Sequence, residues 1–293
     1  MNMKIINTKR CFIGEGPIWN EKEELLYFTN GIENEIHIVD VKNEKTKVRK
    51  TDVSVFAMAF DVENRLYVSC ANGVFLLNDD NTLDEIYDTR KHKIMYGNDM
   101  KVGPDGAIYI GTMSSKRKGV SDKLDGKLYR IDKNGDVRVL LDNLILSNGM
   151  EWSVDEKFFY HTDSDTNIIK EYTFDASDGS ILHTGRSVEV RGVDGFTVDE
   201  KNDLYVACWG QGHIAVVDTE KLAIKDYIEI PADIPASCGF CGAEMDVLAI
   251  TTATYNCDLS KDKNAGYPIL MQMKTKGRRA YLFGEKCDES KNI

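Results

Sequence analysis

The sequence has little proline, few histidines and no long hydrophobic run. Proline and histidine each account for 5 of the 293 residues, whereas glycine accounts for 23. No stretch approaches the roughly 18 consecutive apolar residues that a membrane-spanning helix requires, so such a helix is not expected. Residues 1–16 are interrupted by Lys4, Lys9 and Arg10 and lack the apolar centre of a signal peptide. We therefore expect a cytoplasmic protein that does not contact a membrane.

Positive charge is also scarce. Lys and Arg total 37 against 48 Asp and Glu, which gives a formal net charge of −11. A chain with this balance lacks the positive face that phosphate backbones require, so nucleic acid is not an expected partner. Cysteine occurs seven times. An odd number without a secretory signal favours reduced thiols over a disulfide framework.

The sequence does contain a repeat. Short apolar segments are centred on Tyr27, Tyr67, Tyr109, Tyr160 and Tyr205, with Leu248 at the same place in a sixth copy. The spacings between these positions are 40, 42, 51, 45 and 43 residues. Each copy follows a polar turn and an earlier apolar segment, and is itself followed by alternating runs, a pattern typical of consecutive strands. Four short strands in each of six repeats indicate an all-β, six-bladed β-propeller with four-stranded blades.

The repeat also predicts how the chain is divided. An ordinary β-sandwich with accidental similarity is the alternative, but six copies in register argue against it. The repeats use the whole chain without a linker, so we predict one propeller domain over residues 1–293. No long segment has a 3.6-residue period, so almost no helix is expected. Residues 3–6 should pair with the C-terminal blade and close the ring, because closure removes exposed sheet edges.

Aligning the repeats selects one position near the start of each first strand. First strands line the channel of a propeller, so the six equivalent side chains should form a ring at one mouth. The six positions are Glu15, Phe56, Asn98, Asn148, Asp194 and Ser237. Four of them carry carboxylate or amide oxygen, and a hard cation would offset the buried carboxylates. We predict a metal site in the central channel; the alternative is that these side chains only cap turns.

The ring residues also bear on the identity of the cation. Glu15, Asn98, Asn148 and Asp194 form an all-oxygen set, which favours Ca²⁺ and also suits Mg²⁺ or Mn²⁺. Fe²⁺ and Zn²⁺ are further alternatives. Zinc is not the first choice because no histidine or cysteine lies at a ring position.

Two long loops should rise beside the ring. They span residues 113–125 and 252–266 and connect a second strand to a third strand in their blades. The first loop contains Lys116, Arg117, Lys118 and Lys123, a local basic feature in an acidic chain. It could bind a carboxylate or phosphate of a substrate, or it could be an ordinary solvated loop.

Other motifs are weaker. Cys238 and Cys241 form a lone C-x-x-C on a predicted inner strand, where core packing is the favoured interpretation. Residues 163–167 begin like a calcium-binding EF-hand loop but lack its glycine and its final glutamate, so we reject that assignment. No G-x-S-x-G sequence supports a serine nucleophile. The histidines do not cluster, although His161 should lie near the ring and could support it.

Several segments resemble the SMP-30/gluconolactonase/LRE-like family of regucalcin and sugar lactonases. They span nearly the whole chain in the family's order, at residues 14–19, 98–102, 111–113, 147–153, 163–164, 194–195, 206–208 and 237–240. The resemblance implies a six-bladed propeller with one divalent cation in its channel and Glu15, Asn148 and Asp194 as the metal ligands. It also implies hydrolysis of lactones, typically those of aldonic acids.

The resemblance assigns further roles. The cation would polarise the lactone carbonyl, and Asp194 could act as general base toward the attacking water. Asn98 matches a position that helps to bind metal or substrate. Sugar lactonases often carry arginine where this chain has Tyr96, and some relatives carry an acidic residue where it has Lys116. Because both positions contact the sugar in relatives, we expect Tyr96 and Lys116 at the substrate, where Tyr96 could stack on a ring and Lys116 could meet an anion.

The predicted function is that of a metal-dependent lactonase acting on a small-molecule lactone, with aldono-lactones first. Two alternatives stay open: a metal-dependent phosphotriesterase or aryl esterase, and a non-catalytic, calcium-binding propeller similar to regucalcin. Nothing in the sequence marks an interface between copies, so a monomer is favoured.

Overall fold

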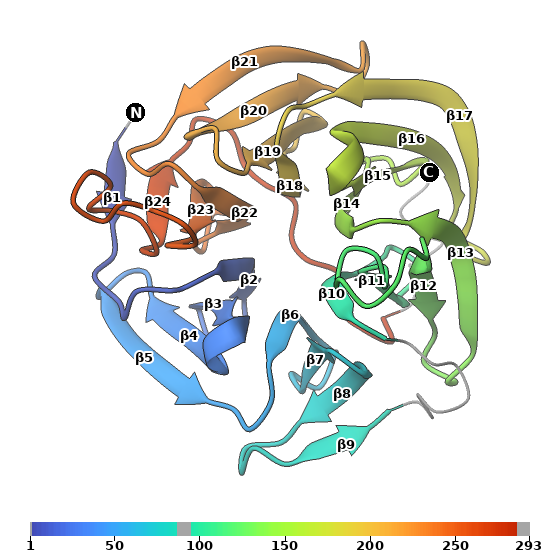
Figure 1. Cartoon of the computed structure of the whole chain (residues 1–293), viewed down its shortest axis with the longest axis horizontal. Helices are drawn as coiled ribbons and strands as arrows, with labels where there is room; N and C mark the ends of the chain where they lie inside the picture. The colour runs from blue at the N-terminus through green and yellow to red at the C-terminus, as the bar shows by residue number, and fades with distance from the viewer. Residues whose placement is uncertain (1, 87–94, 286–293) are drawn as a thin grey trace.

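The apolar segments of the repeat form antiparallel strands around a central channel (Figure 1). The computed structural model describes residues 2–86 and 95–285. Within these residues there are six four-stranded sheets, which confirms the predicted all-β, six-bladed propeller. The first strand of each blade is innermost, and the chain then runs outward strand by strand (Figure 1).

Each blade is a simple meander. Blade 1 contains β2 (Gly14–Asn20), β3 (Leu25–Asn30), β4 (Glu35–Asp40) and β5 (Lys45–Lys50). Blade 2 contains β6 (Val55–Phe60), β7 (Leu66–Cys70), β8 (Gly73–Leu77) and β9 (Leu83–Glu85). Blade 3 contains β10 (Gly97–Val102), β11 (Ile108–Thr112), β12 (Gly126–Ile131) and β13 (Val137–Leu144).

The second half of the ring repeats this order. Blade 4 contains β14 (Ser147–Trp152), β15 (Phe158–Asp163), β16 (Ile168–Asp175) and β17 (Ser180–Glu189). Blade 5 contains β18 (Val193–Val198), β19 (Asp203–Cys208), β20 (His213–Asp218) and β21 (Ala223–Glu229). Blade 6 contains β22 (Pro235–Cys241), β23 (Val247–Thr252), β24 (Ile269–Gln272) and β1 (Met3–Ile5).

The N-terminal strand closes the ring as predicted. β1 pairs antiparallel with β24, with Met3 opposite Met271 and Ile5 opposite Ile269. The helical content of the described residues is limited to two 3₁₀ turns, η1 (Gly31–Glu33) and η2 (Ser164–Thr166). None of the described residues belongs to a helix long and apolar enough to cross a membrane.

The repeated tyrosines pack between neighbouring blades. Three of them make edge-to-face contacts with an aromatic ring on the first strand of the next blade. These pairs are Tyr27 with Phe60 at 5.3 Å, Tyr109 with Trp152 at 4.8 Å and Tyr205 with Phe240 at 5.5 Å between ring centroids. Such contacts add to the free energy gained by burying the rings. The repeat in the sequence therefore reflects one packing unit used at successive blade interfaces.

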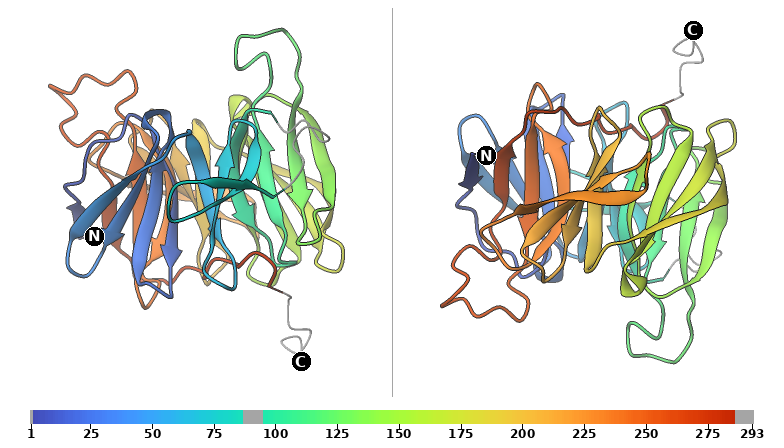
Figure 2. Two further views of the ribbon diagram at one scale, coloured as in Figure 1. Left: turned by 90° about the horizontal axis from the view of Figure 1, so that it is seen from below. Right: turned by 90° about the horizontal axis from the view of Figure 1, so that it is seen from above.

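The two faces of the propeller differ. The loops at 113–125 and 253–268 both rise from one face, which confirms the predicted placement (Figure 2). A C-terminal segment, residues 274–285, crosses the opposite face and was not predicted from the sequence (Figure 2). Its backbone donates hydrogen bonds from Gly277 to Met245 O at 2.8 Å and from Phe283 to Phe60 O at 2.9 Å. This segment, called the C-terminal strap below, joins blade 6 to blade 2 beneath the channel.

Candidate functional site

A β-bulge near the start of every first strand positions the ring side chains. The register shifts between Glu15 and Ile18 in β2 and between Val193 and Phe196 in β18, and equivalent shifts occur in the other four first strands. A bulge redirects side chains that regular pleating would alternate between the two faces of the sheet. The sixfold bulge therefore gives the aligned positions a shared environment at one mouth of the channel.

Two of the predicted ring residues are joined by a hydrogen bond, and a third binds the backbone beside them. The Asn148 amide nitrogen donates to Asp194 Oδ1, and both side chains are buried. The Asn98 amide nitrogen donates to the carbonyl oxygen of Ser147 at 3.0 Å. Because each amide nitrogen is directed at the protein, each amide oxygen becomes the group that can face a cation.

The ring carboxylates lie close enough to oppose each other's ionisation. Burial raises the pKa of Glu15 well above its usual range, and the charges of Asp194 and Asp99 raise it further. Burial likewise raises the pKa of Asp194, again with a contribution from Asp99. Like charges in a desolvated channel disfavour one another, which is the environment that a bound dication would relieve.

Asp99 is a channel residue that our sequence alignment missed. Burial raises its pKa, while the nearby Lys101 acts in the opposite direction. The alignment assigned one position to each blade. The bulge in β10 lies between Gly97 and Met100, so Asn98 and Asp99 both escape the regular alternation of side chains and both can contribute to the channel. The adjacent Asn-Asp pair was visible in the sequence, but only the bulge makes both members relevant.

A second charged cluster lies deeper in the channel. Glu151 accepts hydrogen bonds from Lys101 Nζ at 2.8 Å and from Arg278 on the C-terminal strap. Lys101 Nζ also donates to the carbonyl oxygen of Phe196 at 2.7 Å. Burial acts to raise the pKa of Glu151, but the charges of Lys101 and Arg278 outweigh burial and lower that pKa. In this lower cluster the charge of Glu151 is balanced by the protein's own side chains.

Tyr96 and Lys116 lie at the rim rather than in the ring. Tyr96 has a positive φ of 58° and its carbonyl oxygen accepts a hydrogen bond from Met113 N at 2.9 Å. Lys116 is exposed on the loop at 113–125. Its neighbour Arg117 is the loop side chain whose charge favours ionisation of Asp194 and so opposes the rise in its pKa that burial causes.

The geometry can be compared with known proteins. Residues 13–254 match the SMP-30/Gluconolactonase/LRE-like region. The chain belongs to the SMP-30/gluconolactonase/LRE-like family. The matched region includes all six ring positions, and it confirms the resemblance seen in the sequence.

Three relatives illustrate the relationship to this family. A protein of Bacillus subtilis named "Putative sugar lactone lactonase YvrE" is 29% identical over 251 residues, covering 84% of this chain and 85% of its own length. Regucalcin of Bos taurus is 26% identical over 266 residues, covering 88% and 89%. The crystal structure of a calcium-binding protein, regucalcin, from Agrobacterium tumefaciens has a TM-score of 0.87 at 22% identity and covers 97% of this chain and 98% of that chain. At that identity the last comparison shows a shared fold.

The donor set of the SMP-30/gluconolactonase/LRE-like ring fits a hard cation. Within residues 2–86 and 95–285, no group of three or more histidine, cysteine, aspartate and glutamate side chains has the arrangement of a metal site. Amides, however, supply two of the four predicted oxygen donors, Asn98 and Asn148. Carboxylate and amide oxygens together are donors that Ca²⁺ accepts.

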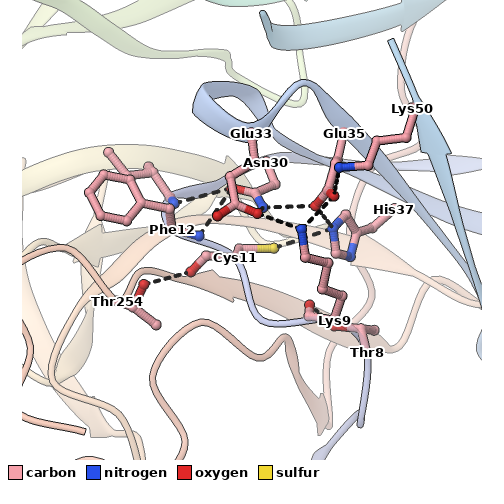
Figure 3. Close-up of polar contacts among 11 residues, drawn as sticks. Thr8, Lys9, Cys11, Phe12, Asn30, Glu33, Glu35, His37, Lys50 and Thr254 are labelled. Carbon is pink, nitrogen blue, oxygen red and sulfur yellow. Dashed lines mark hydrogen bonds and ion pairs between the residues drawn. The ribbon is translucent and has the colours of Figure 1, made fainter.

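The segment that leads into β2 is anchored by a polar cluster (Figure 3). Asn30 Oδ1 accepts hydrogen bonds from the backbone of Phe12 at 3.1 Å and Ile13 at 3.4 Å. Lys9 donates to Glu33 and to the buried Glu35, both at 2.6 Å. These contacts fix the chain two residues before Glu15, which helps to hold that side chain at the mouth.

The same cluster contains a cysteine, a histidine and a glutamate in contact (Figure 3). Cys11 Sγ lies 3.7 Å from His37 Nε2, and Glu35 Oε2 lies 3.3 Å from the same nitrogen. A catalytic triad uses two different ring nitrogens, one toward the nucleophile and one toward the acid. Burial also raises the pKa of the Cys11 thiol and lowers the pKa of His37. We therefore regard the cluster as structural.

The other cysteines and the histidine named in the sequence analysis lie in packed surroundings. Cys238 and Cys241 are buried free thiols, in agreement with a core role. His161 is buried and lies 2.8 Å from Ser147 Oγ through its Nε2, so it supports the residue next to Asn148. Burial lowers the pKa of His161 to about 3, so its imidazole is neutral at physiological pH. His92 and Cys287 lie outside the described residues.

Proposed function

We propose that this protein is a lactonase that uses a divalent cation, Ca²⁺ first, held by Glu15, Asn148 and Asp194. One observation carries the proposal. Asp194 is buried and Glu15 is partly buried, both near a third carboxylate, Asp99, and neither forms an ion pair with a lysine or arginine of the described chain. A desolvated carboxylate without such a partner is costly unless a metal ion provides the compensating charge.

The ring residues have distinct roles in this proposal. A bound divalent cation would supply the charge that polarises a lactone carbonyl. Asp194 accepts a proton from the attacking water, and the amide of Asn148, which donates to Asp194 Oδ1, fixes the orientation of that carboxylate. Glu15 supplies the second anionic ligand. Asn98 faces the substrate side of the ring with its amide oxygen.

Family membership and the rim residues both support the proposed substrate class. The family includes proteins named as sugar lactone lactonases and regucalcins, which supports aldono-lactones and calcium as the first ligands to test. Tyr96 and Lys116 are proposed to contact the sugar, because they lie on the same face as the ring. A cytoplasmic monomer stays a prediction from the sequence.

The decisive experiment is a pH-stat assay on a panel of lactones and aryl esters. The protein is stripped of metal with a chelator and then supplied separately with Ca²⁺, Mg²⁺, Mn²⁺ or Zn²⁺. We expect turnover of an aldono-lactone that disappears on stripping and returns with one cation. Glu15→Gln should lose that metal-dependent turnover, whereas the matched variant Glu229→Gln, on the exposed edge of blade 5, should keep it.

Two outcomes would contradict the proposal. Absence of metal-dependent turnover on every lactone would remove the lactonase function. Tight calcium binding by calorimetry without any turnover would instead favour a calcium-binding propeller, a property named for the Agrobacterium tumefaciens relative.

A further inference from the structure

Apart from Lys116, the loop at 113–125 has no part in the proposed reaction. It rises above the ring face and stands clear of the blades (Figure 2). Its own hydrogen bonds give it a defined shape: Lys118 N donates to Ser114 O at 3.0 Å, and Arg117 N donates to Ser114 Oγ at 3.1 Å. At the base of the loop, Ser115 N donates to Asp125 Oδ1 at 2.6 Å. The basic residues of this loop are therefore presented from a folded turn.

Arg117 reaches from blade 3 toward blade 4. Its Nε lies 3.6 Å from Asp165 Oδ1, and Asp165 belongs to η2, which follows the second strand of blade 4. The Arg117 side chain is half exposed, and its partner Asp165 is also accessible to solvent. At 3.6 Å the pair is too long for a hydrogen bond. The donors of the guanidinium are thus available to an anion that enters the mouth.

A second cation lies on the side of the mouth nearest β10. Lys118 Nζ sits 5.9 Å from the centroid of the Tyr96 ring, within the range of a cation–π contact. Tyr96 is two residues before Asn98, so this contact places Lys118 beside the predicted substrate side of the ring. Two cations from one loop thereby border the mouth in a chain whose net charge is −11.

The charge balance of the mouth sets what can enter it. A dication bound by Glu15 and Asp194 would balance these two carboxylates and leave Asp99 in the channel. At the rim, Lys116, Arg117 and Lys118 stand against Asp165, so the mouth would still have a positive balance. A neutral sugar lactone has no need of such a rim, whereas an anionic substrate would be attracted to it. A guanidinium also matches the geometry of a carboxylate or a phosphate through paired hydrogen bonds.

We propose that the preferred substrate is a lactone carrying a carboxylate or a phosphate ester away from the reacting carbonyl, and that Arg117 binds this anion with Lys118 as a second cation. The inference rests on the proposed lactonase function and names its substrate class. Arg117 is a specificity residue in this assignment, and the hydrolytic step belongs to the ring below it.

The test compares three lactones with the metal-loaded protein. They are glucono-lactone, its 6-phosphate, and glucaro-lactone, which carries a carboxylate; the two charged compounds distinguish phosphate from carboxylate. We expect kcat/KM to be higher for at least one anionic lactone. Arg117→Gln should lower that value roughly tenfold, mainly through KM, and should change glucono-lactone hydrolysis less than about twofold. The matched variant Lys123→Gln removes one charge from the same loop and should leave all three values near those of the wild type.

Two results would overturn the inference. One is equal kcat/KM for the three lactones in the wild type. The other is an Arg117→Gln loss that is the same for neutral and anionic lactones.

A binding experiment separates this inference from the lactonase proposal. Titration calorimetry with gluconate and 6-phosphogluconate, or with glucarate, needs no turnover. Gluconate carries one carboxylate, and the other two acids carry a second anionic group. If no lactone is hydrolysed but an acid with the second anionic group still binds more tightly than gluconate and loses that advantage in Arg117→Gln, the lactonase proposal fails and the anion site stands. Equal binding of gluconate and the acids with a second anionic group in the wild type would reject the anion site.

Discussion

The channel holds two groups of carboxylates in contrasting environments. In the lower group, Glu151 is buried but forms ion pairs with Lys101 and Arg278, and its pKa is lowered. In the upper group, Glu15 and Asp194 are desolvated beside Asp99, and their pKa values are raised. Burial acts in the same direction on all of these side chains. The difference comes from the cationic partners that the fold supplies to one group and withholds from the other.

This difference separates a structural cluster from a site. The lower cluster ties the first strands of blades 3 and 4 to the C-terminal strap, and it is complete as the chain folds. The upper ring has carboxylate charge in excess of its basic partners, and the proposed cation would balance that charge. Perturbed carboxylates in a cleft are typical of functional sites, whereas paired ones are often structural. The comparison can be tested by changing one group at a time.

The largest effect should come from Asp194→Asn. The amide cannot accept a proton from water, so we expect kcat on the best lactone to fall by about 10²–10⁴-fold at saturating metal. The pH-stat assay measures this, with circular dichroism confirming that the variant is folded. Full activity with metal bound would exclude Asp194 as the general base and would weaken the contrast between the two groups.

The next effect concerns the lower group. Lys101→Met leaves the buried Glu151 with Arg278 alone, and removing one partner of a buried ion pair costs about 3 kcal/mol of unfolding free energy. Urea denaturation of the metal-free protein measures the change. Adding Glu151→Gln to this variant should recover part of the loss, because the incompletely paired charge is then gone. If Lys101→Met alone were as stable as the wild type, the lower cluster would not be a stabilising element.

Metal addition should stabilise the upper group. At a free concentration one hundred times its Kd, a bound cation adds about 2.7 kcal/mol to the unfolding free energy. The shift in midpoint on adding Ca²⁺ is read from thermal unfolding. Glu15→Gln should abolish the shift, and Glu229→Gln should keep it. An undiminished shift in Glu15→Gln would place the cation elsewhere.

The smallest effect is the stability of Glu15→Gln without metal. The folded-state pKa of Glu15 is raised, so its ionisation destabilises the folded state above the unfolded-state pKa, and stability is lost as pH rises. Glu15→Gln has no carboxyl group to ionise at this position, so its unfolding free energy does not fall in this way as pH rises. We expect it to be more stable than the wild type by about 1 kcal/mol at pH 7, with a smaller difference at pH 5. A difference that is constant with pH would argue against strained ionisation of Glu15 in the free ring.

Much of this architecture could be predicted from the sequence because it repeats. The tyrosine spacing identified the blades, since Tyr27, Tyr109 and Tyr205 each perform the same packing task against the next blade. Alignment of those repeats then selected the ring residues, because equivalent positions in a closed ring share one environment. Features that occur once gave no such signal. Asp99 and the C-terminal strap have no counterparts in other repeats, so alignment could not detect them.

The sequence by itself determined the number of blades, the closure by residues 3–6 and the ring positions, because each follows from local periodicity and symmetry. Only the tertiary structure decided which carboxylates are paired. Glu151 meets Lys101 from β10 and Arg278 from the strap, residues 50 and 127 positions away in the chain. Electrostatic compensation depends on distance in space, and neither composition nor repeat spacing contains that distance. The same dependence leaves Glu15 and Asp194 without a basic partner, and it brings Arg117 to the mouth above them.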